Sequence, residues 1–125
     1  MKDFKSLQIW NLAFNLNTEL YKISKRFPKD EMYGLTSQLK RASVSISNNI
    51  AEGCGRRTDK DFCSFLYNAM GSLKECENII LIAKDLGYIS QSDFLRLDDK
   101  IKEVGISLNA FIKGVNLRIG GIINA

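Results

Sequence analysis

The chain has 125 residues, of which 45% are hydrophobic, and it carries a formal net charge of +4. A chain of this length can build one hydrophobic core without a metal or disulfides, and its single proline and ordinary composition argue against extensive disorder. Histidine is absent and the longest apolar run, residues 79–83, is far shorter than the ~20 residues that cross a bilayer, so we expect neither a zinc site nor a membrane span.

The first half of the chain contains two segments with apolar residues at alternating steps of three and four, the spacing of an amphipathic helix. The first spans about residues 6–27 and stops at Pro28, because the residue before a proline resists the helical conformation. The second spans about residues 30–52, with its apolar stripe running from Met32 to Ile50. This second segment is rich in serine and asparagine, so we expect it to be helical only because it packs on several sides.

The second half of the chain contains two further segments of the same kind, each with a recognisable start. The third spans about residues 59–86, preceded by Thr58 as a capping residue and followed by Gly87. The fourth spans about residues 91–118 and is preceded by Ser90 in the same role. The chain is therefore predicted to contain four long helices joined by short connections.

Short connections make consecutive helices antiparallel neighbours. The predicted fold is accordingly all-α, an antiparallel up-down-up-down four-helix bundle, formed by a single domain over residues 1–125. A second apolar set near the end of the third segment includes Ile82 and Leu86 and suggests a contact between subunits. The apolar tail at residues 119–125 is a further candidate contact to a neighbouring copy.

Charge is distributed unevenly along the chain. Residues 1–28 hold five basic and two acidic side chains (+3), residues 29–58 hold five and three (+2), and residues 59–87 hold three and five (−2). Such a distribution suits either contact with nucleic-acid phosphates or charge matching between helices and between copies, and both interpretations stay open. The candidate nucleic-acid-binding residues are Lys22, Lys25, Arg26, Lys40, Arg41, Arg56, Arg57 and Lys60.

A polar row on the second segment shares one helical face, because its members follow at steps of four, three and four. They are Arg41, Ser45, Asn48 and Glu52. The row suits phosphate binding or a partner, but we favour a structural polar network of Arg41, Asn48 and Glu52 with Glu75 on the third segment, since a partly buried arginine needs a carboxylate.

The sequence offers no catalytic apparatus. The Gly53–Lys60 stretch contains two glycines, but it follows a helix rather than a strand and lacks the lysine and hydroxyl of a nucleotide-binding loop. The usual general base, histidine, is missing, and neither Cys54 nor Cys63 has a neighbouring base that would make it a nucleophile. We therefore predict a protein that is not an enzyme and that has no metal and no cofactor.

We also expect it in the cytoplasm, since no signal peptide precedes the first polar residues and the three cysteines suit reduced, buried thiols.

Several strings, in this order, resemble one bacterial family, the four-helix-bundle proteins encoded in intervening sequences of 23S ribosomal RNA genes, sometimes labelled ribosomal proteins. The strings are Phe27-Pro28, Gly34-Leu35, Leu35-Thr-Ser-Gln-Leu-Lys-Arg-Ala-Ser-Val-Ser-Ile46, Asn49-Ile-Ala-Glu-Gly53, Gly71-Ser-Leu-Lys-Glu75 and Leu86-Gly-Tyr-Ile89. The resemblance covers essentially the whole chain. Two positions depart from it: Ser47 stands where many relatives have proline, and Cys54 where many have an aromatic residue.

The resemblance implies a bundle that assembles into a homo-oligomeric ring, a pentamer. It extends distantly to the accessory protein of diversity-generating retroelements, a basic pentameric barrel that binds nucleic acid together with a reverse transcriptase. In the family pattern Lys40-Arg41 is the basic pair, and Glu52 and Glu75 are acidic positions.

These observations favour a non-enzymatic homo-oligomer that binds RNA or DNA through a basic surface. The alternative is an assembly scaffold whose basic charge meets a protein partner, with no nucleic-acid role. A pocket for a small molecule between the helices is a third alternative, for which the sequence provides no polar cluster.

Overall fold

The computed structural model describes residues 3–120 and contains four long helices and two short 3-10 helices over that range. The long helices are α1 (Gln8–Ser24), α2 (Leu35–Cys54), α3 (Asp59–Asp85) and α4 (Gln91–Ile119). The 3-10 helices are η1 (Phe4–Ser6), which precedes α1, and η2 (Lys29–Glu31), which lies in the connection from α1 to α2.

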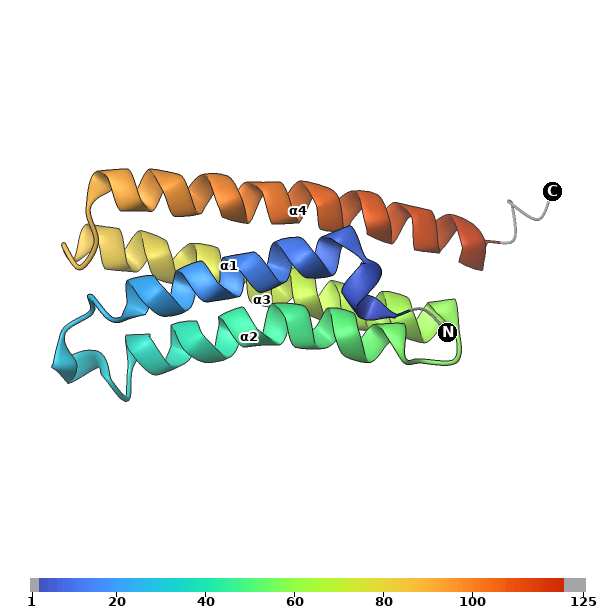
Figure 1. Cartoon of the computed structure of the whole chain (residues 1–125), viewed down its shortest axis with the longest axis horizontal. Helices are drawn as coiled ribbons and strands as arrows, with labels where there is room; N and C mark the ends of the chain where they lie inside the picture. The colour runs from blue at the N-terminus through green and yellow to red at the C-terminus, as the bar shows by residue number, and fades with distance from the viewer. Residues whose placement is uncertain (1–2, 121–125) are drawn as a thin grey trace.

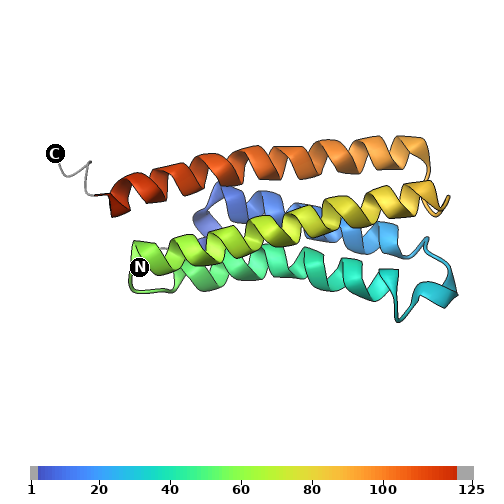
Figure 2. The ribbon, with the colours of Figure 1, turned by 180° about the vertical axis from the view of Figure 1, so that it is seen from behind.

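The four long helices run alternately in opposite directions along one axis (Figures 1 and 2). Each helix packs against the helices next to it in the sequence, and α1 also packs against α4. Thus α1 contacts α2 and α4, and α3 contacts α2 and α4. The predicted fold class, an antiparallel up-down-up-down four-helix bundle, is confirmed. No helix among residues 3–120 is both long enough and apolar enough to cross a bilayer.

One continuous core lies between the helices, because each contributes a buried apolar stripe at helical spacing. Fully buried leucine and isoleucine side chains occur on all four helices, for example Leu20 on α1, Ile50 on α2, Ile80 on α3 and Leu108 on α4. The opposite faces carry the polar and charged residues together with some exposed apolar ones, and the candidate site is built on those faces.

The predicted starts of the third and fourth helices agree with the structure. Thr58 Oγ1 accepts a hydrogen bond from the Asp61 N–H at the start of α3 (3.1 Å), and Ser90 Oγ accepts one from the Asp93 N–H at the start of α4 (3.1 Å). Gly87 follows α3 with φ +79°, a conformation that side chains other than glycine's rarely adopt.

The predicted bounds of the first two helices differ from the structure. α1 begins at Gln8, not at residue 6, because Leu7 is extended (φ −80°, ψ 129°), and it ends at Ser24, not at residue 27. α2 begins only at Leu35, because the backbone at Gly34 is not helical (ψ −112°). Met32, which the spacing placed in the buried stripe of this helix, consequently lies outside the helix and is exposed.

The serine- and asparagine-rich helix α2 packs against α1 and α3 and does not contact α4 within the described residues. Two of its small polar side chains form hydrogen bonds with neighbouring helices: one bond joins the Asn17 side-chain amide to Ser47 Oγ (2.5 Å), and in the other Ser72 Oγ donates to Ser45 Oγ (2.8 Å). These two bonds join α2 to α1 and to α3.

Part of the apolar tail considered as a contact to another copy, residues 121–125, lies outside the described residues.

Candidate nucleic-acid interface

Two hollows lie side by side on the outer surface of α1 and α2, and both are lined by Tyr21. The first hollow is lined by Tyr21, Lys40, Arg41, Val44, Ser45, Asn48, Asn49 and Glu52. The second hollow is lined by Asn17, Thr18, Tyr21, Lys22 and Lys25. We call the surface formed by these residues the α1/α2 face.

Helical periodicity explains why these residues share a surface. On α1, Thr18, Tyr21 and Lys25 follow at steps of three and four, so they lie on one face, while Leu20 and Ile23 point into the core. On α2, Arg41, Ser45 and Asn48 follow at steps of four and three and lie opposite the buried Ile46 and Ile50. The antiparallel packing of α1 on α2 then brings the two polar faces together.

The charge on the α1/α2 face is mostly positive. Lys22, Lys25, Lys40 and Arg41 line the hollows, against one carboxylate, Glu52. None of these four cations forms an ion pair within residues 3–120, and the Lys40 ammonium lies 5.4 Å from the centroid of the Tyr21 ring. The face therefore carries uncompensated positive charge beside an aromatic ring.

The other four predicted cations lie elsewhere. Arg26 forms an ion pair with Asp93 of α4, so it ties α1 to α4. Arg56 and Arg57 line a separate hollow in the connection from α2 to α3, together with Asp59 and Arg118, and Lys60 is the second residue of α3. This connection is at the opposite end of the bundle from the α1–α2 connection (Figure 1), and α2 extends ~20 Å along its axis from Arg41 to its last residue, Cys54.

Arg56 and Arg57 also form no ion pair within residues 3–120, but their hollow contains a carboxylate that pairs with a third arginine, Arg118. The Arg56 guanidinium lies 4.6 Å from the centroid of the Phe65 ring. Arg118, which lines the same hollow, donates two hydrogen bonds of 3.0 Å to the Asp59 carboxylate. The lining of this hollow carries a net charge of +2, from Arg56, Arg57 and Arg118 against Asp59, and the two hollows of the α1/α2 face together carry +3.

The structure places three members of the predicted polar network together and one apart. Arg41, Asn48 and Glu52 line the first hollow, whereas Glu75 on α3 does not line it. In the described part of the chain no hydrogen bond or ion pair joins Arg41 to Glu75, and the neighbouring Glu77 pairs with Lys74 at 3.4 Å. Arg41 is exposed, so it does not need a carboxylate to offset burial.

Sequence reasoning missed Tyr21 and Asn17 as part of this surface. The candidates predicted from the sequence are all basic residues, and Tyr21 is not one of them. Its position one residue before Lys22 and four before Lys25 places it on the same side of α1 as those lysines, and that spacing is the signal that identifies it.

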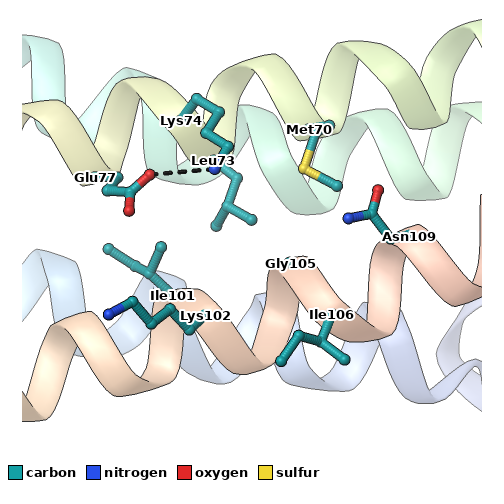
Figure 3. Close-up of a pocket in the computed structure, with 9 residues that line it drawn as sticks. All are labelled: Met70, Leu73, Lys74, Glu77, Ile101, Lys102, Gly105, Ile106 and Asn109. Atoms are coloured by element: carbon teal, nitrogen blue, oxygen red, sulfur yellow. Dashed lines mark hydrogen bonds and ion pairs between the residues drawn. The ribbon is translucent and has the colours of Figure 1, made fainter.

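A second surface feature is an apolar groove between α3 and α4, shown in Figure 3. Its lining consists of Met70, Leu73, Lys74, Glu77, Ile101, Lys102, Gly105, Ile106 and Asn109. Ile106 is 73% exposed, and the Lys74–Glu77 pair lies at one end of the groove. We call this feature the α3/α4 groove.

Within residues 3–120, no three or more cysteine, aspartate or glutamate side chains cluster in a way that would hold a metal ion. All three cysteines are buried, and burial raises the pKa of the Cys76 thiol to about 12, so this thiol stays protonated at neutral pH. Burial, with a smaller contribution from Asp59, also raises the pKa of Cys63.

The fold and surface define a class, helical-bundle proteins with a basic outer face. The model of the 23S rRNA-intervening sequence protein family matches residues 5–110. The chain belongs to this family, as the order of its sequence motifs predicted. No curated protein matches the chain.

A solved structure supports the same architecture. The chain is similar to a protein of unknown function from the S23 ribosomal protein family of Bacteroides thetaiotaomicron VPI-5482, whose crystal structure superposes with a TM-score of 0.78. The two share 19% sequence identity over 84% of this chain and 98% of that chain. At this level of identity the similarity shows a shared fold.

Proposed function

We propose that this chain is a non-enzymatic cytoplasmic protein that binds RNA or DNA through the α1/α2 face. The observation that carries the proposal is that Lys22, Lys25, Lys40 and Arg41 line two adjoining hollows without forming an ion pair in the described part of the chain. Unpaired cations of this kind gain most from contact with phosphates, because binding releases counterions from the nucleic acid. The family's description, which refers to an intervening sequence of 23S rRNA, agrees with a role near RNA.

Binding of this kind depends on phosphates and not on base edges. We therefore expect weak sequence preference and a steep loss of affinity as salt rises. The amide side chains in the hollows, Asn17, Asn48 and Asn49, are suited to hydrogen bonds with sugar and phosphate oxygens, which orient the strand without specifying its sequence.

The test is a fluorescence-anisotropy titration of labelled RNA and DNA oligonucleotides at several salt concentrations. Replacing Lys40 and Arg41 by alanine should weaken binding to every sequence and reduce the salt slope by about 2, because each of the two cations neutralises one phosphate. The matched control replaces Lys100 and Lys113, which lie on α4 and line neither hollow, and should leave the slope nearly unchanged. Absence of binding by the unmodified protein at low salt would contradict the proposal.

We also propose that the chain assembles with copies of itself, five being the number that the family resemblance implies. The α3/α4 groove supports this, because an exposed isoleucine beside an apolar groove gains free energy when another surface covers it. Native mass spectrometry gives the number of copies directly. Ile106→Asp should shift the protein toward the monomer, and a monomeric unmodified protein at high concentration would contradict assembly.

The second candidate function is a scaffold that binds a protein partner and no nucleic acid, and the exposed apolar lining of the α3/α4 groove is the observation that favours it. Arg56 and Arg57 distinguish the two functions. If replacing both by glutamate dissociates the oligomer, these arginines hold subunits together. If it lowers only nucleic-acid affinity, they extend the binding surface from the α1/α2 face.

A further inference from the structure

Tyr21 differs from the other three tyrosines in its surroundings. The hydroxyl of Tyr88 donates a hydrogen bond to Glu31 (2.9 Å), and that of Tyr67 accepts one from the Asn116 amide (3.2 Å), so both are held by the bundle. Tyr33 is 93% exposed but follows Asp30 and Glu31 in the loop between α1 and α2. Tyr21 is 40% exposed, forms no side-chain hydrogen bond within residues 3–120, and is surrounded by cations.

The position of Tyr21 between the hollows is the second observation. Because its side chain lines both, it separates Lys40 and Arg41 on one side from Lys22 and Lys25 on the other. A strand that crosses from one hollow to the other would meet cations on both sides and an aromatic ring in the middle. This combination of a positively charged groove and an aromatic platform is the arrangement by which proteins hold single-stranded nucleic acid.

We infer that Tyr21 is a base-stacking residue and that it makes the α1/α2 face selective for single-stranded over double-stranded nucleic acid. The inference rests on the proposed function and narrows its ligand class. In a duplex the bases are stacked on each other and are not available to a side chain, so the ring contributes to binding only when the strand is unpaired. The cations contribute in both cases, since both ligands carry phosphates.

The experiment compares a labelled single-stranded oligouridine with a duplex RNA of the same length at one salt concentration. Tyr21→Leu should weaken binding of the single strand about tenfold and leave the duplex affinity nearly unchanged. Tyr21→Phe should keep the affinity of the unmodified protein, because the phenyl ring stacks as well as the phenol. Tyr33→Leu is the matched control, an exposed tyrosine away from the two hollows, and should change neither affinity.

A second measurement does not depend on a variant. Photo-crosslinking of the unmodified protein to a single strand that contains 4-thiouridine, followed by peptide mass mapping, should place the adduct on Tyr21. Circular dichroism of each variant confirms that the helices are intact.

Three results would overturn the inference, and only one of them would also contradict the proposed function. Equal losses of single-strand and duplex affinity for Tyr21→Leu would show that the ring only supports the fold. Unchanged single-strand binding, with a loss in the Lys40 and Arg41 variant, would leave the proposed function standing without a stacking residue. No binding of either ligand by the unmodified protein would remove both proposals.

Discussion

Gly53, near the end of α2, allows close packing between two helices, although a glycine at this place suggests only the end of a helix. Gly53 and Gly55 are the two glycines that follow the predicted second helix, a place where glycine commonly ends a helix. In the structure Gly53 is buried inside α2, and a Cβ atom added to it would lie 2.8 Å from both Phe62 Cδ1 and Phe65 Cβ of α3. The absence of a side chain therefore lets the first turns of α3 approach the end of α2 closely.

We expect Gly53→Ala to lower the free energy of unfolding by ~1–3 kcal/mol, because the phenylalanine side chains must move apart to admit a methyl group. The matched control is Gly71→Ala on the exposed side of α3, where an added Cβ meets no atom within 4 Å. That control should raise stability by ~0.5–1 kcal/mol through the better helix propensity of alanine. Urea denaturation followed by circular dichroism measures both, and a stabilised Gly53→Ala protein would contradict the argument.

The sequence also does not show which exposed basic residues form ion pairs. The sequence marks Arg26 and Lys25 as equivalent cations at the end of the first helix. Only the packing of α1 on α4 separates them, because it places Asp93 against Arg26 and leaves Lys25 in the second hollow. An ion pair between residues 67 positions apart has no local signature in the sequence.

At the scale of elements, Glu31 organises the connection between α1 and α2. Its Oε1 accepts a hydrogen bond from the Leu35 N–H (3.0 Å) and so begins α2, while its Oε2 accepts one from the Tyr88 hydroxyl in the connection between α3 and α4 (2.9 Å). One carboxylate thus starts a helix and joins the two connections at the same end of the bundle. The Glu31 contact agrees with the start of α2 at Leu35, directly after the non-helical backbone of Gly34.

This arrangement makes stability depend on pH. The Leu35 N–H and then the Tyr88 hydroxyl lower the pKa of Glu31 below its ordinary value of 4.5, against a smaller opposing effect of burial. A depressed pKa in the folded protein means that the stabilisation is present above about pH 4.5 and is lost as the pH falls through the lower, folded value.

We therefore expect the Glu31→Gln protein to have a lower free energy of unfolding than the unmodified protein at pH 7. The gap between the two free energies should shrink below about pH 4.5. Urea midpoints measured from pH 7 down to pH 3 give the comparison. The control is Asp30→Asn, which removes a neighbouring exposed carboxylate that caps no helix, and its difference should vary less with pH. A Glu31→Gln difference that is constant over the whole range would show that the carboxylate charge has no part in holding the helix end.

For the molecule as a whole, the four helices depend on one shared core. The buried apolar residues form a single cluster to which every long helix contributes. Unfolding of one helix would therefore expose buried apolar side chains of the other three to water. Leu66, which is fully buried on α3, belongs to this cluster. Its neighbour Phe65 is only partly buried, and its ring centroid lies 4.6 Å from the Arg56 guanidinium.

Leu66→Ala should lower the free energy of unfolding by ~2–5 kcal/mol, because it leaves a cavity in the shared core. Helix content and the near-ultraviolet signal of Trp10 should still be lost in one transition, since α1 and α3 share this core. Leu95→Ala, at an exposed position on α4, is the control and should change stability little. Separate transitions for the two signals would show that part of the bundle folds independently.

The order and type of the helices, the antiparallel topology and the family could be determined from the sequence. Each depends on local patterns: apolar residues at helical steps, capping residues such as Thr58 and Ser90, and short connections. These patterns act over a few residues, so they can be read along the chain without knowing what lies opposite.

The composition of the candidate site was decided only by the tertiary structure. The sequence singled out eight basic residues, but their grouping depends on how α1 and α2 face each other and on which acidic residues lie across the bundle. Packing unites Lys22, Lys25, Lys40 and Arg41 around Tyr21, pairs Arg26 with Asp93, and leaves Arg56, Arg57 and Lys60 at the other end. The physical reason is that helix rotation is set by the sum of many core contacts, whereas the outer residues only follow the orientation that the core imposes.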